Sequence, residues 1–271
     1  MYQAFYGLHK DPFSLSPDPE FLFMSATHRS AIARIKFAIQ RRQGLAVIYG
    51  PIGTGKTLLS RVLFKEFRED PSCFTSILIN PSFNTQNQLL QAIMQSFSID
   101  QLPRSKFSLL NVFNAFLTTE AVENSRNVII IIDEAQSINA ANLELIRQLL
   151  NFEGNKQKYL QIVFFSQPEL RLKMNRKPNL KDRIAVVGSL DALDLEDTQQ
   201  LIAHRLRVAG CERQIFSAEA VEEIYKYSQG YPRRINVTCE NALIYGFSAQ
   251  EEVISPDSIR QVVRDFEGGA L

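Results

Sequence analysis

Short apolar runs of strand length alternate along the chain with longer stretches in which apolar residues recur every three or four positions. The runs that fit buried strands lie at 45–49, 76–80, 128–132, 160–165 and, more weakly, 184–187. After the first run, apolar residues are spaced for one buried face of a helix: Leu58, Leu59, Val62, Leu63 and Phe67. Strands separated by helical stretches indicate parallel strands with helical crossovers. The pattern therefore predicts an α/β fold.

The first of these runs leads directly into a glycine-rich loop and then into the helix. The loop has the form G-x-x-x-x-G-K-T and consists of Gly50, Pro51, Ile52, Gly53, Thr54, Gly55, Lys56 and Thr57. Glycines allow backbone conformations closed to other residues, so the N–H groups can surround a phosphate, and the start of the helix adds its positive dipole end. A strand, this motif and a helix together indicate a P-loop (Walker A). We expect Lys56 to reach the terminal phosphates of ATP and the Thr57 hydroxyl to hold Mg²⁺.

An acidic pair follows the most apolar strand. The run Val128–Ile132 is β-branched throughout, as expected of a central strand buried on both faces, and Asp133 and Glu134 come directly after it. This is the form of a Walker B element, in which Asp133 supports Mg²⁺ and Glu134 orients or deprotonates the attacking water. Asp133 could also cap the helix expected next, and the two roles are compatible.

The strand at 160–165 ends in polar residues beside the expected phosphate site. Ser166 and Gln167 stand at this junction, followed by Pro168. Either side chain could sense the γ-phosphate or the attacking water, and Gln167 is the candidate catalytic residue. The alternative is a polar strand end with no role.

Composition narrows the class of protein without naming a function. The chain has 271 residues, enough for about two units, with 45% hydrophobic and 22% charged residues. No apolar run approaches the roughly 18 residues of a membrane span, and the N-terminus lacks the layout of a secretion signal. Widely spaced Cys73, Cys211 and Cys239 favour reduced thiols in a cytoplasmic protein. Lys and Arg number 30 against 29 Asp and Glu, so nucleic-acid binding would depend on local patches.

Further short motifs extend over most of the chain. They are Met1–Leu8 (MYQAFYGL), Pro12-Phe13, Pro17–Pro19, Phe21–Phe23, Leu149–Glu153 (LLNFE), Ser166–Leu170 (SQPEL) and Gly230–Asn236 (GYPRRIN). With the P-loop and the acidic pair, they resemble the AAA+ ATPases, and within these the ExeA-like group together with the transposition regulators TnsC and TniB. The resemblance implies a five-stranded parallel sheet flanked by helices over residues 1–190, including an ExeA-like N-terminal segment at 1–40. It also implies a small helical lid over 191–271.

The resemblance further implies how ATP is bound and hydrolysed. ATP would lie at the subunit interfaces of a homo-oligomer, either a ring or a helical filament. Arg233 matches the sensor-2 position that contacts the γ-phosphate, and the adjacent Arg234 is its rival. A trans-acting arginine finger would come from the segment before the last strand, with Arg183 as first candidate and Lys181 as second. Hydrolysis would then be slow and dependent on assembly. The alternative for Arg183 is a solvated basic surface, since residues 171–183 contain six basic residues and one acid.

The resemblance covers two groups of proteins that have different biological roles. Secretion ATPases of the ExeA kind normally continue into a membrane span and a peptidoglycan-binding region, whereas TnsC- and TniB-like regulators are free-standing. We therefore expect a regulator that assembles on duplex DNA with ATP and recruits or activates a transposase at the target site, together with target-selection proteins. The alternative is an ExeA-like secretion-pathway ATPase module acting on a cell-envelope assembly. A nucleotide-dependent scaffold with little turnover is a third hypothesis.

Contacts to DNA would involve its backbone, because assembly at many sites cannot depend on base identity. The candidate residues are Asn84, Thr85 and Gln88, in the polar stretch after the second strand, and Lys106 in a later loop. In related transposition regulators the DNA-facing surface comes from this part of the fold. For each of these residues, an ordinary solvated loop with a helix N-cap is the alternative.

Overall fold

The computed structural model describes residues 2–100, 102–154 and 157–268, which form two compact units. The α/β unit contains Ala26–Ile52 and Leu59–Leu190. The helical unit contains Gly53–Leu58 and the described parts of Met1–Ser25 and Asp191–Leu271. Met1 of the N-terminal motif and residues 269–271 of the expected lid lie outside the described residues.

Five parallel strands form a single sheet in the order β2-β3-β4-β1-β5. Their bounds are β1 (Leu45–Tyr49), β2 (Cys73–Ile79), β3 (Asn127–Asp133), β4 (Leu160–Ser166) and β5 (Ile184–Ser189). The expected five-stranded parallel sheet is confirmed. The three central strands are buried along nearly their whole length, which explains why their sequences are almost continuously apolar rather than alternating.

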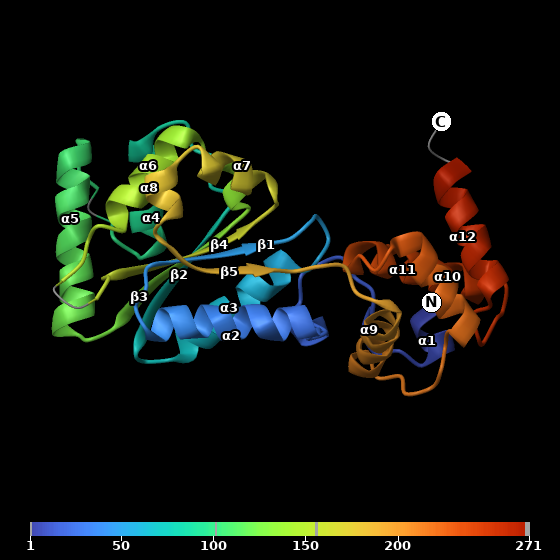
Figure 1. Cartoon of the computed structure of the whole chain (residues 1–271). Coiled ribbons are helices and arrows are strands. Elements are labelled where there is room, and N and C mark those ends of the chain that lie inside the picture. The colour runs from blue at the N-terminus through green and yellow to red at the C-terminus, as the bar shows by residue number, and fades with distance from the viewer. Residues whose placement is uncertain (1, 101, 155–156, 269–271) are drawn as a thin grey trace. The chain divides into compact units, whose positions relative to one another are not determined.

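Helices cover both faces of this sheet (Figure 1). On one face lie α2 (Ala26–Gln40) and α3 (Lys56–Glu69). The other side carries α4 (Gln86–Ser96), α5 (Lys106–Thr118), α6 (Ala140–Leu149), α7 (Glu169–Asn175) and α8 (Pro178–Lys181), with the short turns η2 (Thr119–Glu123) and η3 (Ala135–Ser137) in the connections. The main core forms between the sheet and this second layer, where alternate strand residues such as Val128, Ile130 and Ile132 are buried with leucines of the helices.

The helical unit has its own apolar core. Its elements are α1 (Tyr2–Tyr6), η1 (Pro19–Phe21), α9 (Leu195–Val208), α10 (Ala218–Ser228), α11 (Pro232–Ser248) and α12 (Pro256–Gly268). We expected the N-terminal segment 1–40 within the α/β domain, but its first part packs in the helical unit. Tyr6, Leu8, Phe13 and Phe21 are buried among apolar residues of α9 to α12, which is the physical reason for this placement.

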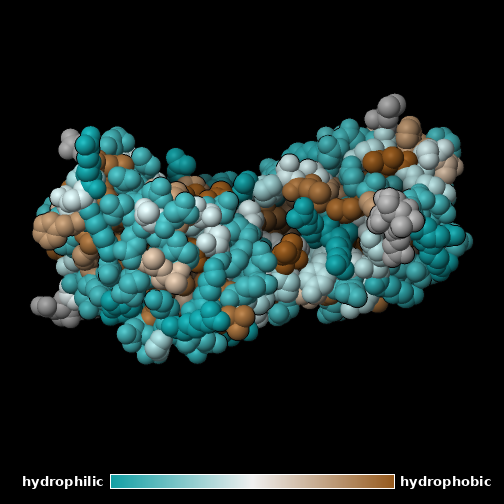
Figure 2. Space-filling model, turned by 90° about the horizontal axis from the view of Figure 1, so that it is seen from above, coloured by the Kyte–Doolittle hydropathy of each residue, from teal (hydrophilic) through white to brown (hydrophobic). Residues whose placement is uncertain are grey.

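The outer surface seen in Figure 2 is mostly hydrophilic, with separate hydrophobic patches. The most exposed large apolar side chains of the described residues are Phe107 at 74% and Leu172 at 67%, and they belong to different helices. Among the described residues, no helix has the length and apolar character needed to cross a bilayer.

Candidate nucleotide-binding site

The phosphate loop follows β1 and ends where α3 begins. Gly50 donates its N–H to the Ser166 carbonyl at 3.0 Å, so the loop leaves the sheet beside the end of β4. Gly53 and Gly55 have φ angles of +84° and +93°, which L-residues with a Cβ rarely adopt. Lys56, at the first position of α3, is only 5% exposed. The local geometry is that of a loop whose backbone can enclose a phosphate at a helix N-terminus.

Asp133 is the last residue of β3 and is fully buried. Its Oδ1 accepts the N–H of Glu134 at 3.0 Å. The helix that follows, α6, is capped by Asn139, whose side chain accepts from the N–H of Asn142 at 2.8 Å. The hypothesis that Asp133 caps this helix is therefore wrong, because η3 separates the two.

Glu134 is held in an unusual backbone conformation. It has φ 54° and ψ 38°, in the left-handed region, where a residue with a side chain is strained. Its Oε2 accepts hydrogen bonds from Nε2 of Gln136 and, at 3.2 Å, from Nε2 of Gln167. The left-handed turn and the two amides together orient the carboxylate.

Gln136 is the functional candidate that sequence reasoning missed. Besides its bond to Glu134, its Oε1 accepts from Ser166 Oγ at 3.2 Å and from the Gln167 N–H at 3.1 Å. The structure thus brings Glu134, just after β3, together with Ser166 and Gln167 at the end of β4. The available signal was an amide side chain two positions after the acidic pair.

Arg233 lies at the start of α11 in the helical unit, in contact with the phosphate loop. Its N–H donates to the Gly53 carbonyl at 3.2 Å, and a Cβ added to Gly53 would come within 2.9 Å of the Arg233 Cβ. The guanidinium of Arg234 stacks on the Tyr231 ring at 5.6 Å. Both arginines are exposed, and within the described part of the chain Arg233 is the one that contacts the loop.

Arg183 and Lys181 lie just before β5, at the edge of the sheet where the strands begin. Nη1 of Arg183 donates to the Leu150 carbonyl at 3.5 Å, and the side chain is half-buried. Lys181 is exposed, and its Nζ donates to Asn175 Oδ1 at 2.9 Å. The phosphate loop leaves from the opposite edge, so the two candidates face away from the loop of their own subunit.

The candidate DNA residues lie near each other on the α4 side of the sheet. Thr85 caps α4, and Thr85 and Gln88 form a reciprocal capping box. Lys106 is half-buried at the start of α5, where its ammonium donates to Gln86 Oε1 at 2.5 Å and to Gln148 Oε1 at 3.0 Å. Asn84 is exposed. Three of the four side chains therefore have structural roles in the free subunit.

A glycine-rich loop between β1 and α3, on a parallel sheet in which β3 ends in a buried acid, defines a P-loop nucleotide-binding protein. Residues 39–174, about half of the chain, match the family described as "AAA domain". The chain belongs to this family of ATPases.

The chain is also 35% identical over 254 residues to "General secretion pathway protein A" of Aeromonas hydrophila. The match covers 92% of this chain and 45% of that protein, so the chain spans about half the length of this relative.

Several solved structures share the fold. ORC2 of Aeropyrum pernix, in its ADPNP–ADP complexes, matches with a TM-score of 0.72 at 21% identity, over 98% of this chain and 76% of that one. The RuvB Holliday junction branch migration motor of Thermotoga maritima gives 0.62 at 19% identity, over 94% and 72%. Drosophila ORC bound to DNA gives 0.68 at 15% identity, over 98% and 65%. At these identities the likeness shows the fold alone.

Proposed function

We propose that the chain binds ATP with Mg²⁺ and hydrolyses it to ADP and phosphate. Lys56 and the loop N–H groups bind the phosphates, and Arg233 contacts the γ-phosphate. In hydrolysis, the water oxygen bonds to the γ-phosphorus as the bond to the bridging oxygen of ADP breaks, and Glu134 accepts the proton of the water. The amides of Gln136 and Gln167 hold that carboxylate in place.

The residues expected to hold the metal suit Mg²⁺. The buried Asp133 carboxylate and the Thr57 hydroxyl offer the oxygen ligands that this ion prefers, and Mg²⁺ usually completes its shell with water and substrate phosphates. When bound, the ion would neutralise charge on the phosphates.

Hydrolysis depends on assembly in this proposal. Arg183 lies at the edge of the sheet opposite the phosphate loop, so it suits a role toward ATP held by a neighbouring subunit. A guanidinium supplied in trans neutralises charge that develops on the transferred phosphoryl group. A ring or a helical filament would provide such contacts repeatedly.

For the biological role, a secretion-pathway ATPase module acting on a cell-envelope assembly has stronger support than a regulator that assembles on DNA. The observation that carries it is the 35% identity to General secretion pathway protein A, which extends over 92% of the chain and so includes both units. Three of the four candidate DNA residues are engaged in caps or internal hydrogen bonds, which weakens the expectation of a DNA-bound regulator.

A regulator that assembles on duplex DNA and directs a transposase is the second candidate. A cavity of about 310 Å³ beside α4 is lined by Asn84, Gln88, Gln91 and Gln95, with Ser82 and Phe83. Neutral amide side chains of this kind can donate to phosphate oxygens without regard to sequence. This groove is the structural feature that favours a DNA backbone as a partner.

One experiment separates the two roles. Purified protein would be followed by analytical ultracentrifugation and electron microscopy with an ATP analogue, with and without duplex DNA, using Lys56→Ala as the control that cannot assemble. Assembly that is the same with and without DNA supports the secretion role. Assembly that requires DNA, and weakens steeply with salt as phosphate contacts are lost, supports the transposition role and contradicts the secretion role. A wild-type protein that stays monomeric with the analogue and DNA would contradict both.

A further inference from the structure

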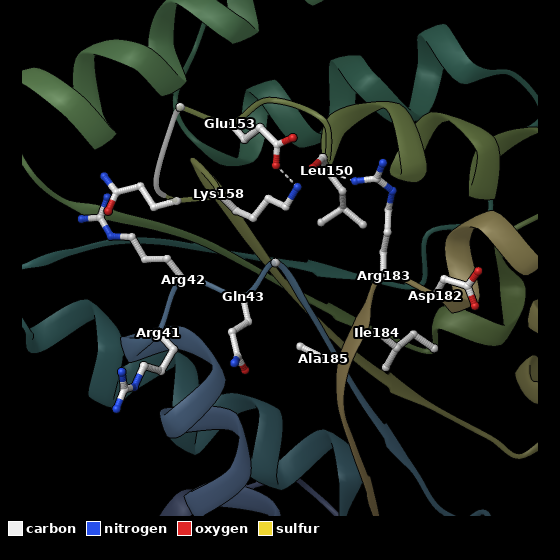
Figure 3. Close-up of a pocket in the computed structure, with 13 residues that line it drawn as sticks. Arg41, Arg42, Gln43, Leu150, Glu153, Lys158, Asp182, Arg183, Ile184 and Ala185 are labelled. Carbon is white, nitrogen blue, oxygen red and sulfur yellow. Dashed lines mark hydrogen bonds and ion pairs between the residues drawn. The ribbon is translucent and has the colours of Figure 1, made fainter.

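A second cavity lies at the edge of the sheet where the strands begin. It has a volume of about 660 Å³ and is bounded by residues just before β1, β4 and β5 and by the end of α6. Figure 3 shows Arg42, Lys158 and Arg183 around it, each from a different segment of the α/β unit.

The cavity contains more positive than negative charge. The Lys158 ammonium forms an ion pair with Glu153, the carboxylate next to it in Figure 3. Asp182 also lines the cavity, but its carboxylate points away from Lys158. The guanidinium groups of Arg42 and Arg183 donate to carbonyl oxygens: Arg42 to those of Ala121 and Ser125, and Arg183 to that of Leu150. Within the described part of the chain, neither forms an ion pair with a carboxylate.

The pKa of Lys158 reflects burial and repulsion by a neighbouring positive charge. Burial lowers the pKa of Lys158, and the nearby positive charge of Arg183 lowers it further. Burial also lowers the pKa of Arg42. Cations that are partly desolvated and repel one another are stabilised when an anion enters the space between them. A phosphate group, with several acceptor oxygens, matches two neighbouring donors of this kind.

We propose that Lys158 acts together with Arg183 as a phosphate-binding pair, and that the phosphate is the terminal phosphate of ATP held by a second copy of the chain. Glu153 is the positioning residue that holds the Lys158 ammonium beside Arg183. This inference rests on the proposed assembly-dependent hydrolysis. It adds a second cation to the trans contact.

The position of the cavity in the sheet explains why the phosphate comes from another copy. The strand β1 separates the cavity at Gly44 from the phosphate loop after Tyr49. Six steps of about 3.3 Å from Gly44 to Gly50 place the two edges about 20 Å apart, beyond the reach of a lysine from one edge to a phosphate at the other. ATP is the phosphate compound that this family binds, so a neighbouring copy is its natural source.

The test compares Lys158→Gln with Lys36→Gln. Lys36 is also a lysine of the α/β unit in an ion pair, with Glu66, but it lies outside the cavity. At protein concentrations where the wild type is assembled, we expect Lys158→Gln to lower ATP turnover at least about tenfold, because one donor to the developing charge is lost. Its affinity for a fluorescent ATP analogue should stay unchanged. Lys158→Arg should recover part of the rate, and Lys36→Gln should match the wild type.

A mixing experiment then establishes that the contact acts in trans. Glu134→Gln subunits cannot hydrolyse ATP but retain Lys158, so adding them to Lys158→Gln should restore turnover at the intact sites of the Lys158→Gln subunits. Restoration supports the proposal, because a defect in folding or in the subunit's own site would persist. Wild-type turnover of Lys158→Gln, or no restoration on mixing, would overturn it.

Three further outcomes identify other causes. Calorimetric binding of inorganic phosphate to the nucleotide-free monomer, abolished by Lys158→Gln while turnover stays normal, would assign the pocket to free phosphate and overturn the trans contact. If wild-type turnover per subunit does not rise with protein concentration, the proposed assembly itself fails. If turnover rises equally in the wild type and Lys158→Gln, only the role of Lys158 fails.

Discussion

At the residue scale, the proposed hydrolysis centre depends on the orientation of a single carboxylate. Glu134 sits in a left-handed turn directly after the buried Asp133, and the amides of Gln136 and Gln167 both donate to it. A carboxylate fixed by donors at one oxygen keeps its other oxygen available to accept a proton from water. The strain of the turn is the structural cost of placing the acid at the end of the strand.

Replacing Glu134 with Gln should therefore separate binding from hydrolysis. The amide keeps the shape of the side chain and loses its basicity, so we expect turnover to fall by at least about 100-fold. ATP affinity should remain within about a factor of two of the wild type, and ATP-bound assemblies should accumulate. Equilibrium binding of a fluorescent ATP analogue and phosphate release would measure the two effects. Lys56→Ala is the control for binding, because this variant should lose nucleotide binding itself. Wild-type turnover in Glu134→Gln would contradict the role of the Glu134 carboxylate.

At the element scale, two close contacts hold the helical unit together. Gly230, between α10 and α11, has φ +73°, and its carbonyl accepts the N–H of Leu193 at 2.9 Å. The guanidinium of Arg205 on α9 is buried, donates to the carbonyls of Pro12 at 2.6 Å and Ser14 at 3.2 Å, and stacks on Phe21 at 5.2 Å. Burial lowers the pKa of Arg205 to about 10.

Gly230→Ala tests the first contact, with Gly7→Ala as its matched control. Both glycines have nearly the same positive φ, +73° and +72°, so each alanine carries a similar backbone strain of about 1 kcal/mol. A Cβ at Gly230 would lie 1.9 Å from the backbone oxygen of Leu193, whereas nothing lies within 4 Å at Gly7. We expect Gly230→Ala to lower the free energy of unfolding by at least about 2 kcal/mol more than Gly7→Ala, because the backbone must shift. Urea unfolding followed by circular dichroism would measure both, and equal losses would contradict the clash.

Arg205→Met tests the anchoring of the N-terminal segment. The change removes donors from buried carbonyls, so we expect a loss of about 2–3 kcal/mol in the free energy of unfolding. Residues 2–25 should also become sensitive to limited proteolysis. Arg213→Met is the matched control, since Arg213 likewise donates to a carbonyl of this segment, at Phe5, and stacks on the Tyr6 ring, but is exposed. Equal protease sensitivity of the two variants would show that burial of the Arg205 contact is unimportant.

At the scale of the whole molecule, the two edges of the sheet carry complementary chemistry. The phosphate loop follows β1 and the acidic pair lies at the end of β3, whereas the basic cavity lies where β1, β4 and β5 begin. The proposed assembly would place one edge of the sheet against the other edge of the next copy, in repeated head-to-tail contact.

Arg183→Ala should reveal this dependence on neighbours. In the wild type we expect ATP turnover per subunit to rise with protein concentration until assembly is complete. Arg183→Ala should bind ATP normally and still assemble, as sedimentation would show, but its turnover at saturation should be at least about 100-fold lower. Addition of Glu134→Gln subunits, which supply an intact Arg183, should restore it. A variant with wild-type turnover would instead place Arg183 in the solvated basic surface.

Much of the fold and of the phosphate site could be predicted because the causes are local in sequence. The P-loop is a continuous stretch, so the spacing of its glycines, lysine and threonine is enough to predict it. The β-branched run before Asp133 likewise predicts a buried central strand. The five strands were found for the same reason. Their order in the sheet was not predicted, because it depends on which crossovers bring distant strands together.

Only the tertiary structure decided which distant residues meet. Gln136 and Gln167 are 31 positions apart, yet both side-chain amides donate to Glu134. Oε1 of Gln136 also accepts from Ser166 Oγ and from the Gln167 N–H, because β3 pairs with β4. The N-terminal segment packs in the helical unit because its aromatic residues are buried in the apolar core of that unit. Lys106, expected to contact DNA from a loop, lies at the start of α5 and donates to two glutamines, one of them from α6. A sequence pattern determines how each segment folds and which chemistry it carries, whereas partners distant in sequence are selected by burial and hydrogen bonding in the packed chain.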